Sequence, residues 1–486
     1  MTDRHTAVWF VVGLAGFVGL AVINWSAHVQ PAGSPVLEWG QLQALQRILG
    51  VRVTQIGMLV AFLVAAAGWL GLRKASEPRV LRWAAVTWSV PLLFTPPLLS
   101  RDAYSYADLG WMVHQGLNPY VTGLGTSGSP AIGVGPDSVW YATVSPYPPG
   151  SLWLMHAAAD LVGHAPFWSA VAMRLPALGS LIVLWWAVPR LTNRLGRPAG
   201  WGSWVVLANP LTLIHVVGGA HNDGPMLAVA ALAMLAMVAV RSRSGLAGAL
   251  LGLATVIKPT AVLLLPVLLV LVWHQRGDQH GRSPRRSLRA VALIGLGSAV
   301  AFFGAALVSG LGFGWLAGLT TPGGAATSAP SFLLRVLLDG RWPGGAAAYA
   351  QPATVAAAVA AFGVLALRWS WAPHRDLLGL LAVGLWLVVL ASPSLRSWYL
   401  LVPLVATALA RPTCGWRAWV AAASVASGVD LIVAELNLPR QSIPGLVLTS
   451  AGSGVVAGLL VALVICRWPW GCTDRAGVPT TGVGDR

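Results

Sequence analysis

Apolar stretches long enough to cross a lipid bilayer recur along the whole of this chain. The hydrocarbon core of a bilayer is about 30 Å thick, so a spanning helix needs about 20 mainly apolar residues. The stretches therefore predict an all-α polytopic membrane protein with about 12 to 14 transmembrane helices. The predicted runs are residues 7–25, 53–72, 80–99, 168–189, 200–217, 224–240, 289–308, 353–367, 377–391, 398–410, 417–434 and 446–466.

Composition and charge agree with a single integral membrane domain over residues 1–486. Hydrophobic residues make up 56% of the chain and charged residues only 9%, whereas about a quarter of the residues in a soluble globular protein are charged. With the N-terminus in the cytoplasm, most of the 31 basic residues fall in inward-facing loops, as the positive-inside rule requires. The net charge of +16 therefore indicates a multi-pass plasma-membrane protein with membrane lipids as partners, and no nucleic acid.

The stretch 245–273 is too long for one span and too short for two. The basic residues before it, Arg241 and Arg243, and those after it, from Arg276, must lie on one side, so the segment must enter and return. Lys258-Pro259 supplies the break, because proline removes a helix donor and disfavours helix in the preceding residue. Lys258 should lie at an apex just below the outer surface, either as a snorkelling anchor or beside an anionic group such as a phosphate.

Two long outward regions, 100–167 and 309–352, are rich in glycine, proline and aromatic residues, and we expect them to form extracytoplasmic layers of short helices and turns. Helical spacing predicts an interfacial helix over residues 102–115 with Asp102 in its first turn. Asp102 either caps this helix or is a functional carboxylate at a membrane exit. Asp108 lies about 240° further round the helix, so the two carboxylates do not pair, and Asp108 is expected to be solvated or structural.

A second outward cluster, His221, Asn222 and Asp223, lies between small residues. A plain polar turn needs only Asn or Asp with Gly, so the additional histidine favours a binding site, whereas His215 is expected to be a buried histidine. Arg396 lies beside Trp398 and Tyr399 in a further outward segment, as part of an interfacial aromatic belt or of the same site. Arg174 is a further candidate for a cation of this site. Trp140 is a candidate for stacking on a sugar ring.

These segments, in this order, resemble the GT-C glycosyltransferases, and more narrowly the actinobacterial α-1,6-mannosyltransferases of lipomannan and lipoarabinomannan synthesis. The motifs that carry the resemblance are RDAYSYADLGWMVHQGLNPY, VSPYPPGSLW, NPLTLIHVVGGAHNDGPM, VIKPTAVLLLP and SLRSWYLLVPL. The sequence departs from the family pattern at Tyr147-Pro148-Pro149, where relatives tend to have Tyr-Gly-Pro.

The resemblance implies a GT-C fold whose extracytoplasmic loops form the active site. It also implies an inverting hexosyltransferase that moves mannose from polyprenyl-phosphomannose to a lipid-linked α-1,6-mannan acceptor. Such a reaction needs a base for the acceptor hydroxyl and cations for the leaving phosphate. We expect no cofactor and no metal ligands, since a lipid monophosphate leaves with less charge than a nucleoside diphosphate and Asp102-Ala103-Tyr104 lacks the second carboxylate of a D-x-D site. The expected roles are general base for Asp102, donor-phosphate binding for Arg101, Lys258 and Arg396, and sugar or acceptor binding for His221, Asn222, Asp223, Tyr106, Tyr147, Trp398 and Tyr399.

Two alternatives remain open from the sequence. A GT-C enzyme with another sugar or acceptor, such as arabinose onto arabinan or mannose onto protein, would carry similar residues. A lipid-linked sugar flippase or secondary transporter would place charges on broken helices near the middle of the membrane, and the Lys258-Pro259 break partly fits that pattern.

Overall fold

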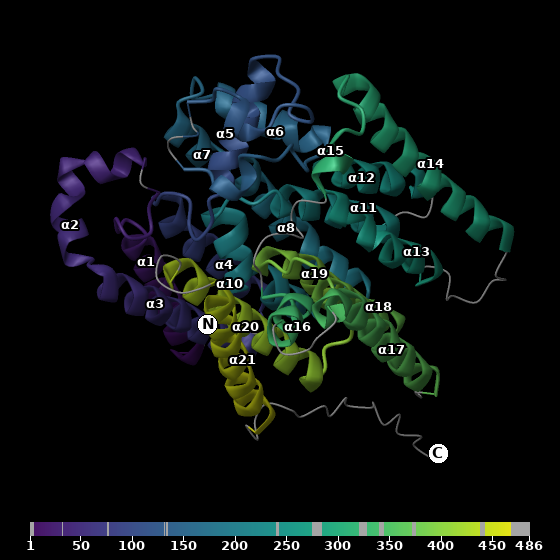
Figure 1. Cartoon of the computed structure of the whole chain (residues 1–486). Coiled ribbons are helices and arrows are strands. Elements are labelled where there is room, and N and C mark those ends of the chain that lie inside the picture. The colour runs from purple at the N-terminus through teal and green to yellow at the C-terminus, as the bar shows by residue number, and fades with distance from the viewer. Residues whose placement is uncertain are drawn as a thin grey trace.

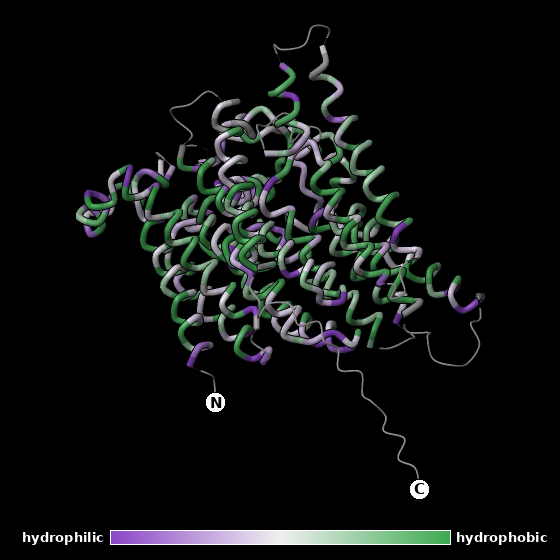
Figure 2. The backbone as a smooth tube through the Cα atoms, turned by 90° about the horizontal axis from the view of Figure 1, so that it is seen from below, coloured by the Kyte–Doolittle hydropathy of each residue, from purple (hydrophilic) through white to green (hydrophobic). Residues whose placement is uncertain are grey.

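A computed structural model describes residues 4–31, 33–74, 77–130, 132, 135–239, 243–274, 284–319, 328–339, 345–371, 376–437 and 443–467. These residues form helices joined by turns, with no β-strand among them. Hydrophobic residues run along most of the long helices, and hydrophilic residues gather at helix ends and connections (Figure 2). The predicted all-α class is therefore confirmed. Residues 320–327 and 340–344 of the second predicted outer region lie outside the described part.

The helices follow one another as shown in Figure 1. Their bounds are α1 Arg4–Ile23, α2 Gln43–Ile48, α3 Val51–Gly71, α4 Pro78–Leu93, α5 Asp102–His114, α6 Pro149–Asp160, α7 Pro166–Ala172, α8 Arg174–Arg194, α9 Ala199–Gly202, α10 Pro210–Thr212, α11 Asp223–Ala239, α12 Ser244–Ile257, α13 Leu265–His274, α14 Pro284–Ser309, α15 Trp315–Gly318, α16 Pro330–Leu338, α17 Ala350–Trp371, α18 Leu377–Leu390, α19 Leu401–Leu409, α20 Cys414–Asn437 and α21 Ile443–Arg467.

Seven of the described helical segments are long and apolar enough to cross a membrane, or eight with one bent pair. The bent pair, Ala199–Leu207 and Pro210–Gly218, turns by 47°. The bend lies at Asn209, because Pro210 has no N–H to continue the helix, and the Asn209 side chain accepts the Leu211 N–H instead. The seven segments are Arg4–Ile23, Val51–Gly71, Pro166–Arg194, Arg285–Ser309, Ala350–Trp371, Cys414–Leu436 and Val447–Cys466.

The predicted break at Lys258-Pro259 is confirmed. Helix α12 ends at Ile257, and Lys258 is extended, with φ −147° and ψ 126°. The backbone of Gly248 packs against Ile294 and that of Gly252 against Ser298, so α12 and α14 run in the same direction. The chain between them must therefore return to the end of the bundle at which α12 began.

Helices α5, α6 and α7 form a layer over one end of the long helices (Figure 1). This layer has its own apolar core, which includes Tyr104, Met112 and Leu152. Helix α5 lies close to α6 because Gly110 has no side chain, and a Cβ there would lie 2.6 Å from the Met155 carbonyl oxygen. The start of α5 is thereby held against the ends of the long helices.

Arg174 in α8 fixes the turns beneath this layer. Its Nε donates to the Val217 carbonyl at 3.1 Å, and its Nη2 donates to the carbonyls of Pro96 at 2.9 Å and Gly218 at 3.1 Å. The side chain is buried. Arg174 is therefore a structural clamp between the segments that follow α4 and precede α11.

Replacing Arg174 by lysine should destabilise the protein. Lysine keeps the charge but lacks the planar fork, so buried carbonyls lose donors at a cost of about 1 to 3 kcal/mol each. The measurement is the apparent Tm of the purified protein in detergent. The matched control is Arg190→Lys at the exposed end of the same helix, where the guanidinium donates to the Trp186 carbonyl of its own helix. An Arg174→Lys variant as stable as this control would contradict the clamp.

Candidate active site

Asp102 lies at the point where the chain enters α5. Arg101 occupies the cap position of the helix, so the simple capping role considered for Asp102 does not hold. The Asp102 N–H donates to Ser100 Oγ at 3.1 Å. Its carboxylate Oδ2 lies 3.5 Å from both Tyr106 Oη and His221 Nδ1. Helix α5 thus directs this carboxylate toward residues that are far away in sequence.

The surroundings of Asp102 favour a carboxyl group that exchanges a proton near neutral pH. Its side chain is only 16% exposed. Burial raises its pKa to about 6, although the positive charges of Lys258 and Arg396 counteract part of this effect. A carboxyl group with such a pKa is ionised at neutral pH and can accept a proton during a reaction.

His221 is placed opposite Asp102 by a tight turn. Ala220 has φ 54°, and the His221 N–H donates to the His215 carbonyl at 2.9 Å. The imidazole is fully buried and stacks on Trp398, with ring centroids 4.1 Å apart. Its nitrogens make no hydrogen bond to the described residues, so the imidazole keeps unused hydrogen-bonding capacity 3.5 Å from Asp102. His215 is buried, as predicted.

Lys258 and Asp223 form a buried ion pair, with Nζ 2.5 Å from Oδ2. The ammonium group also lies 5.5 Å from the ring centroid of Tyr399, within the range of a cation–π interaction. The anionic partner expected for this lysine is therefore a carboxylate of the protein itself. The other Asp223 oxygen, Oδ1, is buried without a hydrogen-bond partner among the described residues.

Asn222 connects the turn to the outer layer. Its Nδ2 donates to Ser151 Oγ at 3.1 Å, and Ser151 in turn donates to the Ile257 carbonyl at the end of α12. The Asn222 side chain therefore holds α6, α11 and the Lys258 break together. This contact gives it a positioning role within the site.

Aromatic residues line a pocket that opens next to Asp102. Tyr106 and Tyr147 meet edge to face, with centroids 5.4 Å apart. The pocket is lined by Asp102, Trp140 and Tyr147, among others. Tyr120 Oη donates to the Tyr147 carbonyl at 2.8 Å. This bond fixes the segment Tyr147-Pro148-Pro149, where the sequence differs from the family pattern. Flat aromatic faces beside a carboxylate suit the binding of a sugar.

The two remaining predicted cations differ in their placement. Arg396 is partly buried and precedes Trp398 and Tyr399, and its charge acts on Asp102. Arg101 is exposed at the cap position of α5. Arg396 therefore belongs to the group around Asp102, whereas Arg101 lies at its edge.

Asp108 is a structural residue, and the alternative of a solvated carboxylate is wrong. It is fully buried and accepts a short hydrogen bond from Ser129. Burial raises its pKa to about 7. The segment 124–130 folds back over α5 and removes Asp108 from water, which the helical spacing alone does not indicate.

One group of chemically active residues was missed by the sequence analysis. His114, His156, Asp160 and His164 lie together at the ends of α5 and α6. The spacing of four between His156, Asp160 and His164 is a detectable signal, because residues four apart share a helix face. His114 comes from another helix and has no such signal.

The comparisons with known proteins agree with the motifs. The family described as alpha-(1->6)-mannopyranosyltransferase, N-terminal domain, matches residues 10–275. Alpha-(1->6)-mannopyranosyltransferase A of Mycobacterium tuberculosis is 32% identical over 65% of this chain and 64% of its own length. The corresponding protein A of Corynebacterium glutamicum is 29% identical over 64% of this chain and 63% of its own length.

The alignments thus span slightly less than two thirds of these two relatives. A probable alpha-(1->6)-mannopyranosyltransferase of Mycolicibacterium smegmatis is 29% identical over 94% of this chain and 88% of its own length. No solved structure matches the chain. The matched residues 10–275 include Asp102, the His221–Asp223 turn and Lys258, and on this basis the chain belongs to the alpha-(1->6)-mannopyranosyltransferase family.

Proposed function

We propose that this protein is an inverting glycosyltransferase that moves mannose from polyprenyl-phosphomannose to a lipid-linked α-1,6-mannan acceptor. The observation that carries the proposal is the convergence on Asp102 of Tyr106, His221 and an aromatic pocket. Membership of a family named for mannosyl transfer supports the choice of sugar.

The proposed reaction uses the charges around the pocket. Asp102 takes the proton from an acceptor hydroxyl as its oxygen attacks the anomeric carbon, and the bond from that carbon to the phosphate oxygen breaks. The electron pair leaves with the phosphate, which Arg396 and Lys258 stabilise, with Arg101 at the edge. Attack from the face opposite the phosphate converts a β-linked donor into an α-linked product. The Lys258 ammonium group would then contact both the bound phosphate and the Asp223 carboxylate.

The sugar rings would pack on the aromatic residues of the site. Trp140 and Tyr147 line the pocket next to Asp102, and Tyr106 packs edge to face against Tyr147. Trp398 stacks on His221, and Tyr399 lies beside Lys258. Asp223 Oδ1, without a partner among the described residues, is available to accept from a sugar hydroxyl. His221, held against Trp398, would orient the hydroxyl that faces Asp102.

We also propose the finer architecture of a GT-C enzyme, with about 12 to 14 spans and the site on the extracytoplasmic side. The described residues contain seven long apolar helices, one bent pair and five apolar helices of 10–17 residues. Together these segments could supply that number of spans. The α5 to α7 layer and the site lie at the same end of the bundle, as an outward-facing site requires. We propose that transfer needs no metal, because Asp102-Ala103-Tyr104 lacks the second carboxylate of a D-x-D motif and Asp223 is paired with Lys258.

Replacing Asp102 by asparagine should abolish transfer while the protein still folds. Loss of a general base costs about 10²- to 10⁴-fold in rate, and asparagine has nearly the same shape. The assay measures release of polyprenyl phosphate and mannosylation of an α-1,6-mannan acceptor by the purified protein. The control is Asp108→Asn. Asp108 is a buried carboxyl group that does not line the pocket, and asparagine resembles its protonated form, so this variant should stay active. Substantial turnover by Asp102→Asn would eliminate the base assignment, and sugar transport without release of polyprenyl phosphate would favour a transporter.

The pH dependence of kcat/KM should report the ionisation of Asp102. Its raised pKa of about 6 means that the base is ionised above this pH and protonated below it. Activity should therefore be high at neutral pH and fall about tenfold for each pH unit below about 6. A rate that is constant between about pH 5 and 7 would contradict the proposal.

Removing the charge of Lys258 should weaken donor binding. A hydrogen bond from an ammonium group to a phosphate contributes about 1.5 to 3 kcal/mol, so Lys258→Met should raise the donor KM about 10- to 100-fold. Because this variant leaves Asp223 buried without its counter-charge, Lys258→Met/Asp223→Asn serves as the stability control. The double variant should regain Tm but not donor affinity. Unchanged donor kinetics in the single variant would show that Lys258 serves only Asp223.

A further inference from the structure

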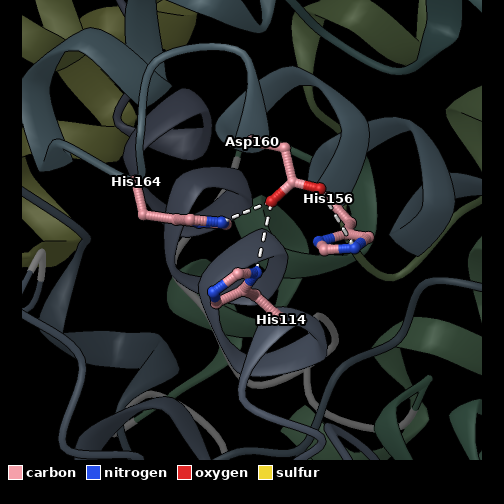
Figure 3. Close-up of side chains that lie close together, drawn as sticks. All are labelled: His114, His156, Asp160 and His164. Carbon is pink, nitrogen blue, oxygen red and sulfur yellow. Dashed lines mark hydrogen bonds and ion pairs between the residues drawn. The ribbon is translucent and has the colours of Figure 1, made fainter.

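Three histidines and one aspartate converge at the end of α5 and α6 that is remote from Asp102 (Figure 3). His114 Nδ1 lies 3.3 Å from Asp160 Oδ1, and His156 Nε2 lies 3.3 Å from Asp160 Oδ2. His164 Nε2 lies 2.5 Å from Asp160 Oδ1. One ligand atom from each of the four residues lies within 4.8 Å of all the others.

The local backbone builds this arrangement. His156 and Asp160 occupy successive turns on one face of α6. Gly163 and His164 then adopt φ values of 61° and 57°, and the His164 N–H returns to the Ala159 carbonyl at 3.0 Å. The left-handed conformation is uncommon for a residue with a side chain. It turns the His164 imidazole back over the last turn of α6, toward Asp160.

We propose that these four residues bind one Zn²⁺ ion. Zinc prefers four ligands in a tetrahedron with bonds of about 2.0 to 2.2 Å to nitrogen and oxygen, which places neighbouring ligand atoms about 3.3 Å apart. The separation of His114 Nδ1 from Asp160 Oδ1 has this value. The 3.3 Å contact of His156 is to the other oxygen, Oδ2, so side-chain rotations would bring His156 to the shared ligand oxygen and lengthen the 2.5 Å contact of His164. Imidazole nitrogens with one carboxylate form a donor set that suits zinc better than magnesium or calcium, which prefer oxygen.

The site is separate from the candidate active site. Asp102 and His114 are the first and last residues of α5, a helix of 13 residues, and lie about 18 Å apart along its axis at about 1.5 Å per residue. With all four positions filled by protein, the ion is structural. The ion would join α5 to α6 at the end opposite Asp102. It would thereby stabilise the close packing of the two helices that Gly110 permits. The side chains of His114 and Asp160 are 47% and 44% exposed, which gives the ion access from water.

The test measures the zinc content of the purified full chain in detergent and, after chelator treatment, its binding of added zinc and cobalt. The wild type should retain about one Zn²⁺ per chain by elemental analysis, give the strong visible absorption of tetrahedral Co²⁺, and gain Tm on zinc addition. His114→Ala and Asp160→Asn should each weaken binding by at least tenfold and lose the gain in Tm. His114 is half exposed at a helix end, so its replacement should leave the metal-free Tm unchanged.

The matched control is His28→Ala, which removes an exposed histidine outside the cluster and should bind zinc as the wild type does. Three results would each overturn the proposal: no zinc retained by the wild type, equal binding by the wild type and His114→Ala, or cobalt absorption of octahedral type. Because none of these measurements uses mannosyl transfer, they are independent of the proposed catalytic function.

Discussion

The buried ion pair between Lys258 and Asp223 joins the segments on which the site depends. An isolated lysine in apolar surroundings costs about 2.5 to 3.5 kcal/mol on insertion scales, so the pair ties the break after α12 to the first residue of α11. Tyr399 then packs beside the ammonium group and Trp398 beside His221. Removal of one partner from such a pair typically costs about 3 to 5 kcal/mol. The lysine therefore has a structural role whether or not it also binds a phosphate.

The apolar surroundings that require this pairing also give Asp102 its chemistry. Few carboxylates are present, with 15 acidic residues in 486, and Asp102 is placed where α5 meets the ends of the long helices. Burial raises its pKa toward neutrality, while nearby cations keep it from rising further. Asp108, on the same helix but turned away, is instead buried against Ser129. The two carboxylates thus differ in role because of what packs against each.

Features set by local sequence could be predicted, and features set by packing between distant segments could not. The start of α5 at Asp102 and the break at Lys258 follow from helical spacing and from Pro259, and both are present in the structure. The pairing of Lys258 with Asp223 joins residues 35 positions apart, and nothing in either segment indicates it. The burial of Asp108 depends on the fold of the loop at Ser129. The histidine cluster needs His114 from α5 beside His156, Asp160 and His164 in and just after α6, and the close approach of the two helices at Gly110 brings them together.

We propose that the group around Asp102 holds the donor with its anomeric carbon toward this carboxylate. A cryo-EM density map of the protein with an uncleavable polyprenyl-phosphomannose analogue tests it most directly. We expect the phosphate within hydrogen-bonding distance of Arg396 and Lys258, the sugar against the aromatic pocket, and Asp102 facing the anomeric carbon from the side opposite the phosphate. A donor bound at the other end of the bundle, or with Asp102 turned away from the sugar, would contradict the account.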